Sequence, residues 1–218
     1  MNIFTCVFVV GTSIFITGIE YLKNEASYRE AFDSLPEFRK EKARKMVQER
    51  SKRECVGAWI LLRKALSSWG VCLDELQVKV NAFGKPEVPD VDNLFFNFSH
   101  SGERVLCCIS ERSVGCDVEQ IKPSRLKVAR AAFSPTEYEY LEAVPEGEDR
   151  DDLFFRIWTR KESYLKAIGT GFGTEPAKIT VWPQAGRMHF YEKKLDGYRF
   201  CCCAESEAEP DWNEVKDG

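Results

Sequence analysis

The spacing of apolar residues changes along the chain, from helical periods to short β-forming runs and back again. An apolar stretch at residues 2–10 predicts a buried strand, followed by a loop or a second extended segment. Residues 35–47 and 51–67 have the period and composition of helices, and Ser51 with Glu54 forms a capping box at the start of the second. The chain is therefore expected to open with a strand and two helices.

A meander of short strands is predicted after these helices. Beyond Gly70 the apolar period shortens, and turn residues separate the segments. Residues 101–104 (SGER) are expected to form a hairpin loop between two of the strands. The β-forming segments are LQVKVNAFGKP, NLFFNFSH, VLCCIS and VGCDVE.

Helices return in the second half of the chain. After the helical segment SRLKVARAAF, Ser134 is expected to cap the helix SPTEYEYLEAV, with Pro135 in its first turn and Glu137 completing a capping box. The longest helix, DDLFFRIWTRKESYLKAIG, should end at Gly169. Further strands are predicted at KITVW, RMHFYE and YRFCCCAE.

This alternation of helices and mostly antiparallel strands predicts an α+β fold, with two batches of elements before and after about residue 112. With 218 residues the chain can bury a full core as one large domain or as two small ones. The segment from residue 205 carries six acidic residues and one lysine, so a solvated or disordered tail is expected there.

Composition mainly excludes classes of function. A formal net charge of -4 gives no basic excess of the kind that would indicate nucleic-acid binding. The nine cysteines are odd in number and form no C-x-x-C pair, which favours reduced thiols in a cytoplasmic protein. The apolar start lacks a basic region and is interrupted at residues 11–13, so neither a signal peptide nor a membrane span is expected.

Candidate chemistry appears first in GCDVEQIK, residues 115–122. In a strand, Asp117 and Glu119 share one face with Gly115, while the apolar residues between them face the core. Two carboxylates at this spacing repel each other unless a cation lies between them, and a hard divalent cation is the simplest candidate. The alternative is the solvated outer face of an edge strand, and a third ligand would decide between the two.

The long helix supplies a candidate third ligand. Glu162 and Lys166 flank an apolar stripe, and from there Glu162 can reach the acidic strand if the helix packs on it. The alternative is an ordinary i, i+4 surface pair. Three carboxylates, completed by waters and substrate phosphates, would suit Mg²⁺. The stripe expected to pack inward consists of Phe154, Ile157, Trp158, Tyr164, Leu165 and Ile168.

Polar side chains near the predicted turn after residue 100 could bind an anion. His100 lies between Ser99 and Ser101, whose hydroxyls can donate to a phosphate. His189, within a predicted strand, is expected to be a structural hydrogen-bonding residue instead.

Basic residues could extend such an anion site. Arg53 lies in the first turn of a predicted helix, where free N–H groups favour anions, and Lys85 lies in a turn. A solvated surface is the default explanation for the cluster that includes Arg53. Its members are Arg39, Lys40, Lys42, Arg44, Lys45, Arg50, Lys52 and Arg53.

Five motifs, in this order and spacing, resemble the phosphopantetheinyl transferases of the surfactin-synthetase-activating type. The combination of G-x-D-x-E with W-x-x-K-E-x-x-x-K is the most specific part of the resemblance. The matching motifs, within about residues 35–172, are FGKP (83–86), NFSHSG (97–102), VGCDVEQIKP (114–123), FSPTEY (133–138) and WTRKESYLKAIGTG (158–171).

This resemblance implies a pseudodimer of two similar α/β lobes, residues 1–112 and 113–218, with coenzyme A in the cleft between them. It implies transfer of the 4'-phosphopantetheine arm to a serine of an acyl or peptidyl carrier protein, with release of adenosine 3',5'-bisphosphate. Fatty acid, polyketide and nonribosomal peptide synthesis are the pathways that such enzymes serve. A cytoplasmic monomer that binds neither nucleic acid nor membrane is expected.

The resemblance also implies roles for individual residues. Mg²⁺ would be held by Asp117, Glu119 and Glu162. Glu162 would also be the base for the serine, directly or through a metal-bound water, and Lys166 would contact the pyrophosphate and stabilise developing charge. The other coenzyme contacts implied are Lys85, Ser99 and His100 at the phosphates, and Arg39, Lys42 and Arg53 at the adenosine 3'-phosphate.

One departure from the family pattern concerns the adenosine contacts. Glu54 stands where the family usually has a small or hydroxyl residue, directly beside Arg53. Glu137 matches an acid of the family, but its capping-box role is sufficient to explain it. Two other functions stay open from the sequence: another magnesium-dependent phosphotransferase or a nuclease, and a carrier-binding homologue without catalytic activity.

Overall fold

The computed structural model describes residues 11–81, 84–169, 175–182 and 187–216. Its helices are α1 (Glu25–Asp33), α2 (Glu37–Arg44), α3 (Glu49–Ser68), α4 (Leu126–Ala132), α5 (Pro135–Glu142) and α6 (Glu148–Ile168). Its strands are β1 (Thr12–Gly18), β2 (Lys79–Val80), β3 (Pro86–Glu87), β4 (Phe95–Ser101), β5 (Arg104–Ser110), β6 (Val114–Gln120), β7 (His189–Leu195), β8 (Tyr198–Ala204) and β9 (Asp211–Glu214). Short 3₁₀ turns are η1 (Glu20–Lys23), η2 (Leu73–Glu75) and η4 (Pro176–Lys178).

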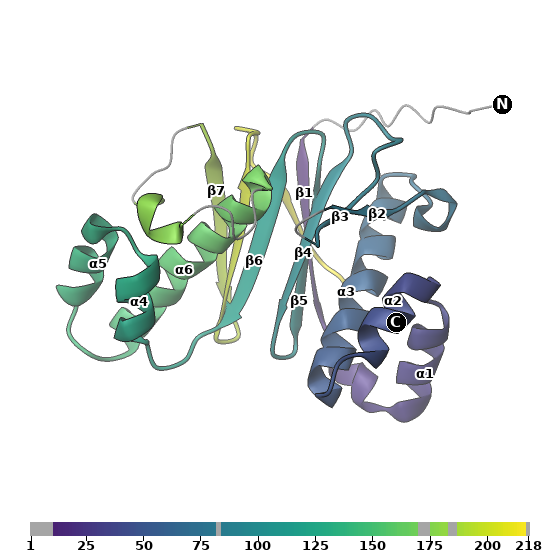
Figure 1. Ribbon diagram of the computed structural model, residues 1–218, viewed down its shortest axis with the longest axis horizontal. Helices are drawn as coiled ribbons and strands as arrows, with labels where there is room; N and C mark the ends of the chain where they lie inside the picture. Colours follow the sequence, from purple (N-terminus) through teal and green to yellow (C-terminus); the bar gives the residue numbers. More distant parts are fainter. Residues whose placement is uncertain (1–10, 82–83, 170–174, 183–186, 217–218) are drawn as a thin grey trace.

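The strands form two main sheets between two groups of helices (Figure 1). One sheet has the order β4-β5-β1-β9 and the other β6-β8-β7, while β2 and β3 pair separately. Helices α1–α3 lie at one side of the molecule and α4–α6 at the other. All strand pairs are antiparallel except β1 with β9. The predicted α+β class, with mostly antiparallel sheets covered by helices in each half, is confirmed.

Strand β5 shows how the layers are built, because both of its faces are buried. Val105 and Ile109 pack into the core shared with α3, whereas Leu106 and Cys108 pack into a core shared with β6 and β8. The four-stranded sheet thus has helices on one face and the second sheet on the other. This double burial explains why the segment VLCCIS is almost continuously apolar.

The three consecutive cysteines of β8 act as small apolar residues in two layers. Cys202 faces the core between the sheets, and Cys203 faces α6. Burial raises the pKa of the Cys201 thiol well above its usual value, with a smaller contribution from Glu192. All eight cysteines of the described residues are free thiols.

Gly115 allows α6 to lie directly across β6. A Cβ atom at this position would overlap the backbone of Ser163 and Ala167 in α6. The missing side chain therefore permits a close approach of helix and strand. This contact sets the height and rotation of α6 relative to the acidic strand.

Arginine side chains fasten α6 to β7 as well. Arg156 Nε donates to Glu192 Oε1 at 3.0 Å, and Arg160 pairs with the same carboxylate. The Glu192 side chain is 12% exposed. Burial alone would raise the pKa of Glu192, but the hydrogen bonds and charges of Arg160 and Arg156 outweigh it and hold this pKa below its ordinary value.

The free energy of unfolding is expected to depend on pH through Glu192. Since its pKa is lower in the folded state than in the unfolded chain, its contribution is present above the ordinary carboxyl range, about pH 4, and is lost as the pH falls through the folded value. In Glu192→Gln the acid limb of a pH series of urea denaturations should be shallower than in the parent. Equal acid limbs in the two proteins would contradict this assignment.

Several predicted elements were wrong. Ser51 and Glu54 do not cap a helix, because α3 begins at Glu49 and both residues lie inside its first turns. The segment KITVW is not a strand: it contains the end of η4 and an extended stretch, in which the buried Val181 N–H donates to the Glu137 carboxylate. Helix α1 was not predicted.

The ends of the chain also differ from expectation. The tail predicted to be solvated or disordered contains β9, which pairs in parallel with β1 and so joins the end of the chain to the first sheet. The strand predicted at residues 2–10 lies outside the described residues.

In α6, Ile168 was expected in the inward stripe, but it is 38% exposed. Two local predictions are confirmed: Ser134 caps α5 in a capping box with Glu137, and α6 ends at Ile168 with Gly169 as its C-cap at a φ of 71°.

Candidate active site

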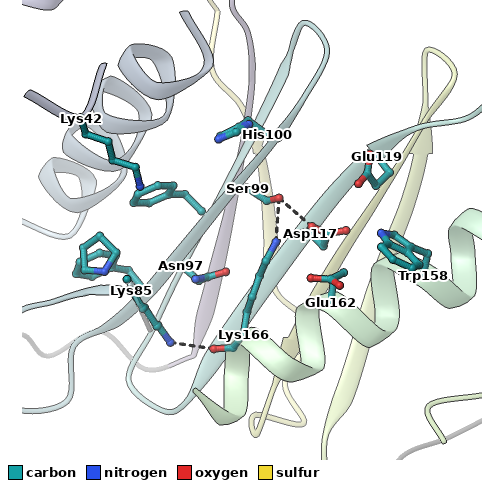
Figure 2. A pocket seen from close by; sticks show the side chains of 14 residues that line it. Lys42, Lys85, Asn97, Ser99, His100, Asp117, Glu119, Trp158, Glu162 and Lys166 are labelled. Carbon is teal, nitrogen blue, oxygen red and sulfur yellow. Dashed lines mark hydrogen bonds and ion pairs between the residues drawn. The ribbon is translucent and has the colours of Figure 1, made fainter. Parts of the chain in front are cut away.

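A cavity of about 630 Å³ opens between the two halves of the chain. From the first half, α2, β4 and the turn around Lys85 line it; from the second half, β6 and α6 do so. Asp117, Glu119 and Glu162 all face this cavity, as does Lys166 (Figure 2). The structure therefore brings the three predicted acids together, which depends on the packing of α6 on β6.

Strand β4 presents a row of polar side chains to β6, although the two strands share no ladder. Asn97 Oδ1 accepts from the backbone N–H of Cys116 at 2.9 Å. Two residues on, Ser99 Oγ donates to Asp117 Oδ1 at 2.9 Å, and Ser101 Oγ donates to Glu119 Oε2 at 2.8 Å. Alternate residues of β4 thus fix the acidic strand from the other half of the molecule.

Lys166 reaches from α6 to the same acids. Its Nζ lies 2.6 Å from Asp117 Oδ1 and 3.1 Å from Ser99 Oγ (Figure 2). Burial alone would lower the pKa of Lys166, but the charge of Asp117 and the hydrogen bond to it outweigh burial and raise this pKa. The ammonium group is therefore held charged at the centre of the cavity.

The other two carboxylates are electrostatically crowded. Burial, followed by the charge of Asp117, raises the pKa of Glu119, although Ser101 and Lys166 oppose the shift. The same two causes, opposed by Lys166, raise the pKa of Glu162. Such a cluster is stabilised by additional positive charge, because each anion disfavours ionisation of its neighbours.

Asp117 retains one unsatisfied oxygen. Its Oδ2 is buried and has no hydrogen-bond partner among the described residues, while Oδ1 is occupied by Lys166 and Ser99. A buried carboxylate oxygen without a partner is costly unless a ligand completes it. Within the described part of the chain, however, no three acidic, histidine or cysteine side chains are already arranged as a metal site.

Two lysines and a histidine line the cavity on the side of the first half. Lys42, Lys85 and His100 all border it, across from Glu119 and Glu162 (Figure 2). Lys85 Nζ donates to the backbone carbonyls of Lys166 at 3.1 Å and Val114 at 3.4 Å. Burial lowers the pKa of Lys85. The cavity thus has one acidic wall and one cationic wall.

Two predicted coenzyme contacts do not line the cavity. Arg39 is only 2% exposed; its guanidinium donates to the Cys55 carbonyl at 2.8 Å and lies over the rings of Trp59 and Phe98. Arg53 is half-buried within α3 and likewise lies outside the cavity lining. Of the basic cluster predicted from the sequence, Lys42 is the member that borders the cavity.

Sequence reasoning missed some members of the site. Asn97, which positions β6, was not singled out, and Ser101 was expected to donate to an anion but holds Glu119 instead. Trp158 lines the cavity from α6, although it was expected to pack inward. The polar residues of NFSHS recur at every second position, so the alternation could have revealed a polar strand face. Trp158 opens the motif W-x-x-K-E-x-x-x-K, and this position could have marked it as a candidate site residue.

Comparisons with known proteins agree with these motifs. A family model described as the 4'-phosphopantetheinyl transferase superfamily matches residues 113–209. A 4'-phosphopantetheinyl transferase of Bacillus subtilis is 32% identical over 134 residues, which is 61% of this chain and 59% of the relative. The 4'-phosphopantetheinyl transferase gsp of Aneurinibacillus migulanus is 31% identical over 164 residues, covering 70% of this chain and 68% of the relative.

The chain belongs to the 4'-phosphopantetheinyl transferase family. The similarity extends further along the chain in the 4'-phosphopantetheinyl transferase Sfp of Bacillus subtilis (strain 168), which is 28% identical over 190 residues, 81% of this chain and 83% of the relative. The part matched by the family model contains β6 and α6 and hence all three acids of the cavity. No described helix of this phosphopantetheinyl transferase has the length and hydropathy needed to cross a membrane.

Proposed function

We propose that this protein transfers the 4'-phosphopantetheine arm of coenzyme A to a serine of an acyl or peptidyl carrier protein. The serine Oγ forms a bond to the phosphorus on the pantetheine side of the pyrophosphate, and adenosine 3',5'-bisphosphate leaves. The observation that carries the proposal is the convergence of Asp117, Glu119, Glu162 and Lys166 on one cavity with a cationic opposite wall. A pyrophosphate needs this mixture of acids for a metal and cations for its oxygens.

The acidic wall fits a bound Mg²⁺. The unsatisfied Asp117 Oδ2 and the raised pKa values of Glu119 and Glu162 indicate oxygen ligands in need of positive charge. We propose that these three acids hold the ion, with substrate oxygens and waters completing its shell. When bound, Mg²⁺ supplies charge neutralisation at the pyrophosphate.

The side chains of the cavity have separate roles in the proposed transfer. Glu162 accepts the proton of the attacking serine, since α6 places its carboxylate at the cavity wall beside Asp117. Lys166 faces the pyrophosphate and stabilises negative charge that develops there. Ser99 and Ser101 act as positioning residues, because they hold Asp117 and Glu119 through hydrogen bonds.

A smaller groove next to the cavity supports the carrier protein as acceptor. It has a volume of about 240 Å³ and shares Glu119 and Trp158 with the cavity. Lys122 and Arg125 give it positive charge, while its apolar lining is Val128, Phe154 and Phe155. We propose that an acidic carrier with an apolar patch beside its serine docks here, which would direct the serine toward the acids.

Intact mass spectrometry tests the proposed function. The protein is incubated with coenzyme A, Mg²⁺ and, separately, an apo acyl carrier protein and an apo peptidyl carrier domain. We expect one carrier to gain the mass of one phosphopantetheine group, and we expect EDTA to abolish the gain and excess Mg²⁺ to restore it. Absence of a mass gain on every carrier tried would contradict the proposal, and transfer unaffected by EDTA would contradict the metal site.

A further inference from the structure

Lys85, from the first half of the chain, contacts both elements that carry the charged groups of the acidic wall. Its Nζ donates to the Lys166 carbonyl in α6 at 3.1 Å (Figure 2) and to the Val114 carbonyl in β6 at 3.4 Å. Strand β6 also carries Asp117, and α6 also carries Glu162. One ammonium group thus joins these two elements to the first half.

The last turn of α6 depends on donors from outside the helix. A helix leaves its last four carbonyls without partners of its own. Here the Ala167 carbonyl accepts from Ser113 Oγ at 2.6 Å, and Lys85 supplies the donor for the preceding carbonyl, that of Lys166. A positive charge at this position is also favoured by the negative end of the helix dipole.

The backbone of Lys85 is itself fixed in the turn between β2 and β3. Its N–H donates to Asn81 Oδ1 at 3.0 Å, and its carbonyl accepts from the Asn81 N–H at 2.9 Å. Asn81 Nδ2 donates to Glu87 Oε1 at 2.7 Å, and Pro86 fixes its own φ directly after Lys85. The Lys85 side chain therefore reaches α6 from a firmly held base.

The ammonium group of Lys85 is committed to backbone carbonyls. It has three N–H donors, and the carbonyls of Val114 and Lys166 accept from it. Burial lowers the pKa of Lys85, and the charge of Glu87 opposes this shift only in part. Movement of Nζ toward a bound phosphate would take this donor away from both carbonyls, which is unfavourable for buried polar groups.

The Lys166 side chain starts from the turn that Lys85 holds. From there its Nζ reaches Asp117 Oδ1 at 2.6 Å and Ser99 Oγ at 3.1 Å. A shift or rotation of this turn would carry the Lys166 ammonium group away from Asp117, because the backbone sets the point from which the side chain extends.

We propose that Lys85 is a positioning residue of the transfer: from the first half it holds the backbone of Lys166 and so keeps the Lys166 ammonium group where negative charge develops. The inference rests on the proposed function, and it gives Lys85 a role that acts through α6 rather than through contact with a phosphate. Loss of the Lys85 ammonium group should therefore slow the reaction more than it weakens coenzyme binding, for which Lys42 and His100 remain at the cavity wall.

Steady-state transfer by Lys85→Met tests this role, with Lys79→Met as the matched control. Lys79 lies on the same hairpin but is exposed and outside the cavity lining, so its variant should match the parent. With saturating Mg²⁺ and carrier, we expect kcat of Lys85→Met to fall by about tenfold to a hundredfold, because a small displacement of a charge-stabilising group is costly. An unchanged kcat, or a KM for coenzyme A that rises by a larger factor than kcat falls, would overturn the inference.

A double-mutant cycle with Ser113 separates action through α6 from contact with coenzyme A. Ser113 holds the next carbonyl of the same turn and lies outside the cavity lining, so Ser113→Ala removes no side chain from the cavity. If both side chains act on this turn, the change in kcat of the double variant should differ from the product of the single changes by more than about twofold. Reproduction of that product would show independent effects and contradict the inference.

Hydrogen exchange of the protein without substrates gives a readout that does not depend on transfer. In Lys85→Met the amides of residues 165–169 should exchange about fivefold faster than in the parent, the effect of one hydrogen bond, while those of β5 stay protected because the core remains folded. Lys85→Gln keeps a neutral donor and should show a smaller change, and it replaces Lys85→Met in the test if the latter does not fold.

The exchange experiment also distinguishes failure of this inference from failure of the proposed function. Equal exchange of residues 165–169 in parent and variant would overturn the inference and leave the proposed function intact. Absence of transfer by the parent would contradict the proposed function, whereas faster exchange in Lys85→Met would still show that Lys85 holds the end of α6.

Discussion

Replacing Asp117 with asparagine is expected to lower kcat/KM for transfer to the carrier by about a thousandfold or more. Asp117 lies at the centre of the acidic wall, where it contacts Lys166 and Ser99 and keeps one oxygen free. The amide has the same shape but lacks the charge that would bind Mg²⁺ and hold the Lys166 ammonium. The measurement is steady-state transfer with saturating Mg²⁺ and coenzyme A.

A matched substitution separates this effect from general damage. Asp90→Asn makes the same chemical change at an exposed position outside the cavity lining, so it should leave kcat/KM unchanged. Asp117→Asn should also retain its fold, because the nearby charge of Glu162 still compensates the Lys166 ammonium group. Full activity of the Asp117→Asn variant would contradict the proposed metal site.

Replacing Glu137 with alanine is expected to have the largest effect on stability, about 3–5 kcal/mol. The Glu137 carboxylate is fully buried; it accepts from the backbone N–H of Ser134 at 2.9 Å and of Val181 at 2.6 Å. It also pairs with Lys161 of α6 at 2.7 Å, and burial lowers the pKa of this lysine. The alanine variant would leave a buried ammonium group without its counter-ion.

Urea denaturation measures this loss, with Glu139→Ala as the control. Glu139 lies on the same helix but is exposed, and its loss should change the free energy of unfolding by less than about 0.5 kcal/mol. Below the unfolding transition, Glu137→Ala should transfer the arm at nearly the parent rate, because Glu137 lies outside the cavity lining. A catalytic defect with unchanged stability would show that Glu137 acts in the reaction instead.

The contacts of Glu137 show which interactions a local sequence pattern can predict and which it cannot. The capping box with Ser134 is encoded within four consecutive residues and was predicted correctly. The same carboxylate also holds Val181 and Lys161, and neither contact could be predicted from local sequence. The failed capping box at Ser51 and Glu54 is the converse case: the motif is present, but α3 begins before it, and Glu54 pairs with Arg50 and His100 instead.

The candidate site likewise combines features that the sequence pattern predicted with features that only tertiary packing produced. Alternation along β6 determined that Asp117 and Glu119 share a face, since that period is a property of any strand. Their meeting with Glu162 follows from the close packing of α6 on Gly115, and the hydrogen bonds from Ser99 and Ser101 follow from the edge contact of β4 with β6. The resemblance to a family predicted this convergence, whereas the periodicity of the chain could not.

The sequence by itself determined the class of fold, most of the helices and strands, and the identity of the acids and of Lys166 as candidates for chemistry. Tertiary structure decided which cations face the cavity, with Arg39 directed into the core and Lys42 left at the wall. Tertiary structure also decided that β9 pairs in parallel with β1. The physical reason is that periods and caps depend on neighbours within a few residues, whereas burial and charge pairing depend on groups that only folding brings together.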